Sequence, residues 1–174
     1  MRSTRNQRGF TLVETLVYIV IISIIVTVVV STLLWIVRSE ANAKARRVTA
    51  DNTRSVMRIM TREIREAKIL YTPTMTLPTQ LSLETKINLP PGETSTYVDF
   101  FLCGTRLCLK REFQNPIALT SEDVEVTNIT FTEVTTNSIP SIQIALQIEY
   151  KNPGNKPELE VAVNATTTVS LRSY

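Results

Sequence analysis

The feature that most constrains this chain is an uncharged stretch of 22 residues, from Leu16 to Val37, which contains neither proline nor glycine. At about 1.5 Å per residue, a helix of this length reaches roughly 33 Å and crosses the ~30 Å hydrocarbon core of a bilayer. Isoleucine and valine occupy most of its positions, and Trp35 lies where an interfacial aromatic residue is expected. A buried helix of a soluble core is the alternative, but the run is too long for that in so short a chain. The sequence therefore predicts one transmembrane helix over about residues 16–37.

This apolar run is expected to stay in the mature protein. The apolar region of a secretory signal covers only about 7–15 residues and ends at small residues, whereas Arg38 follows Val37 directly. The charges beside the span do not settle its orientation, because basic residues flank both ends. Three arginines lie in the first nine residues, and Arg38, Lys44, Arg46 and Arg47 follow the span.

Composition excludes several classes of function. The chain has no histidine, and therefore lacks the usual general base and the commonest metal ligand. None of its four glycines begins a phosphate-binding loop or a dinucleotide motif. We therefore expect no enzyme activity, no metal site and no cofactor. Calcium binding would require acidic loops to converge, and no loop motif supports it; the acidic residues considered are Asp99, Glu122, Asp123 and Glu125.

The charges are distributed unevenly. Residues 38–68 hold nine basic and four acidic side chains, whereas residues 69–174 hold seven basic and eleven acidic ones. The basic segment fits a solvated helix face near lipid headgroups, or a contact with acidic surfaces of neighbouring subunits. Binding of nucleic acid is disfavoured, because no aromatic residues interleave with the basic ones and the C-terminal part is mildly acidic.

One carboxylate interrupts the apolar segment at its start. From Phe10 to Val37, Glu14 is the one charged side chain. A carboxylate in hydrocarbon costs at least ~2.5 kcal/mol, so Glu14 needs an explanation. Either it lies at the headgroup level in the first turn of the span, or it awaits a cation brought later, such as an amino group of another subunit.

Residues 8–16 read RGFTLVETL and abut the apolar run. This segment resembles the class III signal of prepilins and pseudopilins, the subunits of type IV pili and type II secretion systems. The matching elements are a short basic leader, Gly9 at its last position, Phe10 next, and Glu14 as the fifth residue after the cut.

The resemblance implies that a prepilin peptidase cuts between Gly9 and Phe10 on the cytoplasmic side, and that the new amino group of Phe10 is N-methylated. It also implies the orientation that charge leaves open, with the N-terminus inside. Glu14 lies one helical turn from Phe10 and could pair with its own terminus or with that of a neighbour. In the family, the neighbour pairing is thought to set subunit register.

The helix is expected to continue beyond the membrane, because neither proline nor glycine occurs from Phe10 to Tyr71. Residues 38–71 carry apolar side chains at 3–4 spacing and predict an amphipathic continuation. Arg62 and Glu66 are spaced for an ion pair on the wet face, where Glu63 is also expected. Residues 60–67 resemble the corresponding helix of J-class minor pseudopilins and W-class minor pilins.

The remainder, residues 72–174, predicts an extracytoplasmic β domain. Proline and asparagine punctuate it, and apolar side chains alternate between these breaks. We expect one antiparallel sheet whose apolar face is covered by the amphipathic half of the helix, which gives an α+β, pilin-like fold. The expected strands include residues 81–89, 97–102, 107–113, 124–131 with a slip in phase, 142–150, and the region 159–171.

The chain has two cysteines, Cys103 and Cys108, which could face each other across the predicted hairpin. They suit a disulfide in an oxidising compartment, although free or buried thiols remain the alternative. A metal site would need more ligands than lie nearby, and a catalytic thiol would lack a histidine partner.

The sequence thus predicts three segments: a leader at residues 1–9, a long helix at 10–71, and the β domain at 72–174. The predicted function is that of a minor pilin or pseudopilin. It would be stored as a single-pass protein in a bacterial-type inner membrane, contact lipid there, and later join other subunits through its N-terminal helix. The alternative is a single-pass, membrane-anchored binding module with no role in assembly.

Overall fold

The structure is a computed structural model that describes residues 11–71, 78–87, 89, 91–136 and 139–171. The chain divides into two compact units between Glu40 and Ala41, and each unit is described by itself. Gly9 and Phe10, at the predicted cleavage site, lie outside the described residues, as does the rest of the leader.

One helix, α1, runs from Leu12 to Glu66. It ends earlier than the expected boundary at residue 71, because Ala67–Leu70 forms the strand β1 instead. Leu70 pairs with Leu83 of a neighbouring strand, and the Thr85 Oγ1 atom donates to the Glu66 carbonyl over 3.2 Å. This bond satisfies one of the carbonyls that a helix end leaves free. Strand pairing therefore overrides the helix propensity of the last predicted turn.

Five antiparallel strands form the first sheet, in the order β1-β2-β3-β4-β5. Its strands after β1 are β2 (Leu81–Thr85), β3 (Thr96–Cys103), β4 (Arg106–Arg111) and β5 (Ile117–Ala118). The predicted hairpin is confirmed as β3 and β4, which pair from Val98–Arg111 to Cys103–Arg106. The predicted strand over residues 81–89 is shorter in the structure, because β2 ends at Thr85.

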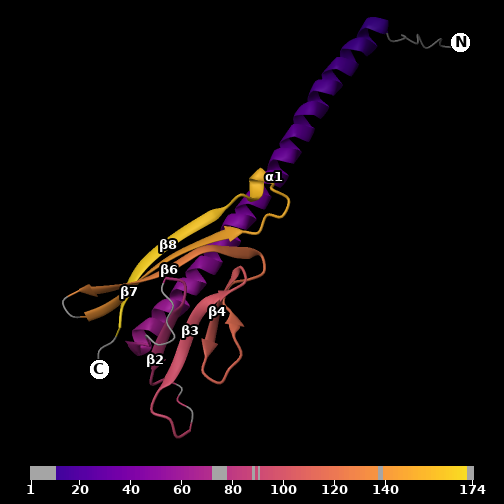
Figure 1. Cartoon of the computed structure of the whole chain (residues 1–174). Helices are drawn as coiled ribbons and strands as arrows, with labels where there is room; N and C mark the ends of the chain where they lie inside the picture. Colours follow the sequence, from indigo (N-terminus) through magenta and orange to yellow (C-terminus); the bar gives the residue numbers. More distant parts are fainter. Residues whose placement is uncertain (1–10, 72–77, 88, 90, 137–138, 172–174) are drawn as a thin grey trace, which may run out of the picture. The chain divides into compact units, whose positions relative to one another are not determined.

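Three longer strands form a second antiparallel sheet in the order β6-β7-β8 (Figure 1). The prediction of a single sheet is therefore wrong, although the α+β class is confirmed. Alternation of side chains shows which face of a strand is buried, but it does not show which strands pair. The strands are β6 (Val124–Thr136), β7 (Ile139–Tyr150) and β8 (Ala162–Ser170), and a short 3-10 helix, η1 (Pro157–Leu159), precedes β8.

The predicted slip in phase within β6 is confirmed as an irregularity between Val126 and Asn128. Val124 and Val126 are buried before it, and Ile129 and Phe131 are buried after it. An extra residue at Thr127 keeps both apolar pairs on the same face, as a β-bulge does.

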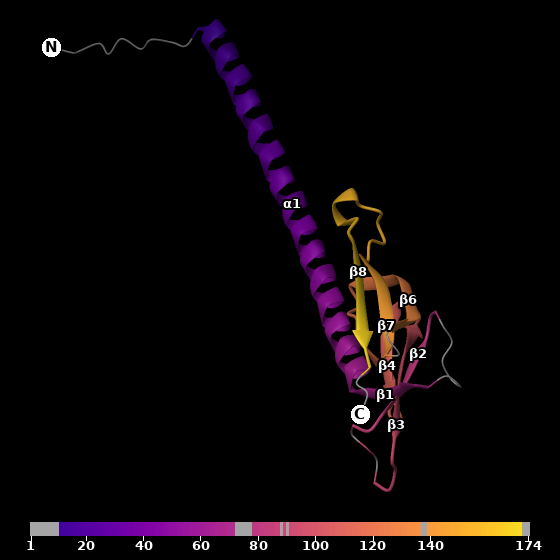
Figure 2. The same ribbon diagram turned by 90° about the vertical axis from the view of Figure 1, so that its left-hand side faces the viewer.

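Residues 41–66 of α1 supply the helical side of the core, and the strands lie to one side of this segment (Figure 2). Val56, Met60 and Ile64 are fully buried and pack in one cluster with side chains of both sheets. The buried stripe also includes Thr49 and Thr53. Their hydroxyl groups donate to the carbonyls of Ala45 and Thr49, at 2.9 and 2.8 Å, so that these polar groups are satisfied within the helix.

Candidate functional site

The N-terminal turn of α1 holds the carboxylate that the sequence singled out. Thr11 precedes the helix, and its Oγ1 atom accepts a hydrogen bond from the Glu14 backbone N–H over 3.3 Å. Residues 11–14, with threonine first and glutamate fourth, have the spacing of a capping box. Sequence reasoning missed this cap, although the spacing could have shown it.

The Glu14 side chain is exposed and lies in the first turn of the helix. Within the residues that the structure describes, no lysine or arginine lies within 4.0 Å of it. The positive end of the helix dipole favours a carboxylate at this position. The site is therefore a carboxylate held at the start of an apolar helix and open to a cation from outside the described part of the chain.

The helix that follows Glu14 is apolar on its surface. The segment from Leu12 onward is long and apolar enough to cross a membrane, and none of the side chains in its most hydrophobic window is buried. Four hydroxyl side chains within it donate to carbonyls one turn earlier, at 2.7 to 2.8 Å. These residues are Ser23, Thr27, Ser31 and Thr32. These four hydroxyl groups are thus satisfied within the helix itself.

The Cys103 and Cys108 sulfur atoms are bonded, with the Cα atoms 5.9 Å apart. Cys103 lies opposite Arg106, and Cys108 lies opposite Phe101. The link therefore crosses the β3–β4 hairpin diagonally next to its two-residue turn, in which Gly104 has a φ of +71°. Glycine adopts this left-handed backbone conformation without a steric penalty.

The four acidic residues considered for calcium do not form one group. Asp99 lies on β3 opposite Lys110, and Glu122 forms an ion pair with Arg106 at 3.5 Å. Within the described part of the chain, no three histidine, cysteine, aspartate or glutamate side chains are placed to hold a metal ion.

Glu63 is not on the wet face, where the sequence placed it. Its carboxylate is only 9% exposed and accepts a hydrogen bond from the Arg111 Nη2 atom of β4 over 2.6 Å. This ion pair ties the helix to the first sheet. The predicted pair of Arg62 and Glu66 is confirmed, at 3.2 Å on the surface.

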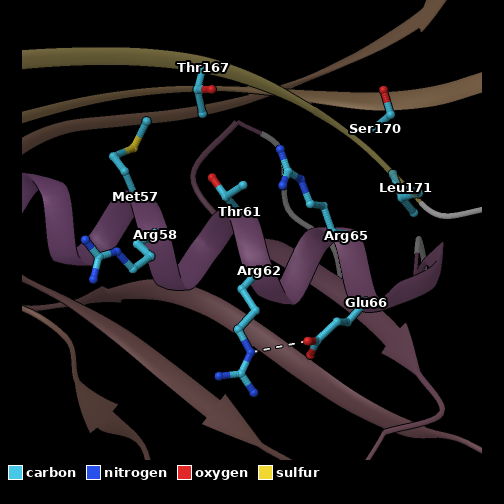
Figure 3. A pocket seen from close by; sticks show the side chains of 9 residues that line it. All are labelled: Met57, Arg58, Thr61, Arg62, Arg65, Glu66, Thr167, Ser170 and Leu171. Atoms are coloured by element: carbon cyan, nitrogen blue, oxygen red, sulfur yellow. Dashed lines mark hydrogen bonds and ion pairs between the residues drawn. The ribbon is translucent and has the colours of Figure 1, made fainter.

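A hollow of about 790 Å³ lies between α1 and β8 in the second unit. In Figure 3, Thr167 of β8 points toward Met57 and Thr61 of the helix, and Arg65 extends toward the same strand. Arg58 lies along the helix, and Arg62 leaves it on the side away from β8 in this view. Exposed guanidinium groups bind carboxylates and phosphates, so this part of α1 is a second candidate surface.

The comparisons with known proteins bear on the first site. A family model described as the prokaryotic N-terminal methylation motif matches residues 4–30. The match contains Gly9, Phe10 and Glu14, together with residues 16–30 of the predicted membrane span. No curated protein matches the chain, and no solved structure does.

Proposed function

Because the chain carries the N-terminal methylation motif of type IV prepilins and pseudopilins ahead of a pilin-like α+β fold, we propose that it is a structural minor subunit of a type IV pilus-like filament or a secretion pseudopilus. The observation that carries this proposal is the motif at residues 4–30, which continues into an exposed apolar helix. The motif is that of structural subunits, and we propose neither catalysis nor a cofactor.

Processing comes first in the proposed route. A prepilin peptidase cuts after Gly9 on the cytoplasmic side of the inner membrane, and Phe10 becomes the methylated N-terminus. The cut removes three arginines and creates a single cation next to Thr11, the residue that caps α1. The helix stays in lipid, with the C-terminal domain outside the cytoplasm.

Assembly follows when the apolar helix exchanges lipid for the helices of other subunits. The Glu14 carboxylate then pairs with the Phe10 ammonium of a neighbour. A charge pair in a low-dielectric bundle defines register, since a subunit shifted along its axis leaves both charges unpaired at a cost of several kcal/mol. The exposed side chain of Glu14 and the lack of a cationic partner in the described residues support this role.

The second candidate is a membrane-anchored binding module that never assembles. The apolar helix and the β domain suit it equally well, but it assigns no role to a methylation motif. The two candidates differ in the covalent state of the N-terminus.

Mass spectrometry of the protein isolated from its host membrane is the decisive test. The pilin proposal predicts a mature chain that begins at N-methylated Phe10, and it predicts that Gly9→Val leaves the leader attached, because a side chain next to the scissile peptide crowds it. The matched control is Asn6→Val, which changes the leader without touching the cut. An intact Met1 in cells with an active prepilin peptidase would favour the binding module.

A further inference from the structure

One face of the second unit carries a row of arginines on α1. We define the arginine row as Arg47, Arg54, Arg58 and Arg65, all of which are exposed. Arg54 lies 3.6 Å from Asp51. The other three have no ion pair with any described residue. Most of the positive charge of this row is therefore available to an outside partner.

The row points away from the core. Its members are spaced 7, 4 and 7 residues apart, which places them within an arc of about 40° on a helix with 3.6 residues per turn. The fully buried Val56 and Met60 lie on the opposite side of the same turns, against the sheets. The arginine row thus leaves α1 on the side opposite Val56 and Met60, and two of its members, Arg58 and Arg65, also line the hollow next to β8.

The outer surface of the sheet layer carries the opposite charge. A hollow of about 460 Å³ is lined by three glutamates together with neutral residues. We define the glutamate hollow by Glu125 of β6, Glu149 of β7 and Glu160, which precedes β8. Glu125 alternates with the buried Val124 and Val126, so its side chain points away from the helix.

This placement of glutamates is unfavourable in the isolated subunit. Glu125 and Glu149 are direct partners across β6 and β7, and like charges in that position are destabilising. No lysine or arginine of the described chain lies within 4.0 Å of Glu125, Glu149 or Glu160. The Glu149 Oε1 atom is held by Gln147 and Thr127, at 2.9 and 3.3 Å. The hollow therefore lacks the cations that would offset its charge.

We propose that the arginine row of one subunit docks into the glutamate hollow of a second copy of this chain. The two surfaces lie on opposite sides of the same domain and carry opposite charge. Contact between them is heterologous, or head to tail. Each pair of docked subunits therefore still has one free arginine row and one free glutamate hollow. Guanidinium groups suit this contact, because their planar donors match carboxylates in pairs.

This inference rests on the proposed function and deepens it, since it names the surface through which extracytoplasmic domains meet in a filament. The contact needs only two adjacent copies of the chain. A subunit present in small numbers can meet this requirement. The contact is expected to weaken at high salt, because the charges on both surfaces are near water.

Photo-crosslinking tests the contact in full-length protein in its membrane. A photoreactive benzoylphenylalanine replaces Thr61, which lies on α1 between Arg58 and Arg65. We expect a crosslinked dimer whose second peptide comes from β6, β7 or the segment before β8. The double variant Arg58→Glu/Arg65→Glu should lower the dimer yield about ten-fold, and so should Glu125→Lys/Glu149→Lys.

Charge reversal provides the control. The chain that combines both double variants should recover most of the dimer yield, because its two surfaces are again complementary. A mixture of the two double variants should recover it as well. Lys86→Glu/Lys110→Glu changes the net charge by the same amount as the arginine double variant, away from both surfaces, and should have little effect.

Crosslinks to lipid, to nucleic acid or to a different protein, or a yield that charge reversal does not restore, would overturn the proposed contact. Cleavage after Gly9 is measured in the same samples. A processed protein without the crosslink rejects the contact alone, whereas an unprocessed protein rejects the proposed function.

Discussion

The proposed function moves Glu14 from lipid into a filament. We expect Glu14→Ala to leave cleavage after Gly9 intact but to reduce incorporation into filaments strongly, because the alanine offers no partner to the Phe10 ammonium of a neighbour. Incorporation is measured by immunoblotting of sheared or overexpressed filaments against the membrane pool.

The companion variant Glu14→Gln keeps the size and hydrogen-bonding capacity of the side chain and removes its charge. It should assemble as poorly as Glu14→Ala if charge sets the register. Wild-type incorporation of the glutamine variant would instead assign Glu14 to the N-terminal turn of its own helix, where Thr11 already caps the Glu14 backbone N–H.

The Glu63–Arg111 pair is a second residue-scale feature. Glu63→Ala leaves a partly buried guanidinium without its carboxylate and should lower the free energy of unfolding by roughly 2–3 kcal/mol. Urea denaturation followed by circular dichroism measures the loss. Arg62→Ala is the matched control, because it breaks the exposed pair with Glu66 and should cost at most about 0.5 kcal/mol.

The paired variant Glu63→Leu/Arg111→Leu separates the two causes of that loss. It removes both charges together and should recover much of the stability, because neither polar group is then left without a partner. Equal losses in the single and the paired variants would show that packing, and not the ion pair, sets the stability at this point.

At the scale of elements, the β3–β4 hairpin is held by its own ladder as well as by the Cys103–Cys108 bond. The bond closes a short loop, and we expect Cys103→Ser/Cys108→Ser to lower the free energy of unfolding by less than ~3 kcal/mol. Thermal unfolding with and without a reducing agent measures the change. A domain that fails to fold without the cysteines would contradict the view that strand pairing closes this turn.

The sequence predicted correctly those strands in which buried and exposed side chains alternate regularly. Ile142, Ile144, Leu146 and Ile148 are all buried along β7, as their strict alternation indicated. The bulge in β6 was also visible, because its apolar residues change phase. The partition into two sheets was not, since pairing depends on contacts between distant strands.

The end of α1 and the position of Glu63 were missed for related reasons. Residues 67–70 favour a helix by propensity, and it is their pairing with β2 that makes them a strand. Glu63 is charged, and a charged side chain is expected to be exposed when only the sequence is known. Only the position of Arg111 on β4 explains its burial. The N-terminal site, in contrast, is local in sequence and could be predicted from residues 8–14.

At the scale of the whole molecule, the second unit contains a complete core. Its buried cluster is drawn from residues 56–171, without a side chain from the segment before Ala41. We therefore expect residues 41–174 to fold as a soluble domain when produced alone. Size-exclusion chromatography and a single cooperative thermal transition by circular dichroism measure this.

A chain that begins at residue 67 is the control for this prediction. It lacks Val56, Met60 and Ile64, which fill the helical side of the core, and should aggregate because the apolar faces of both sheets are uncovered. If the longer fragment also aggregated, the membrane segment would be needed for folding and not only for anchoring.

The serine and threonine hydroxyls of the apolar segment donate to carbonyls of their own helix. These hydrogen bonds form within the helix, so they are the same whether lipid or protein surrounds it. These four hydroxyl groups therefore need no new hydrogen-bond partner if the helix leaves the bilayer as proposed. If the chain assembles as proposed, the carboxylate of Glu14 is the group in this segment that gains a new partner on leaving the membrane.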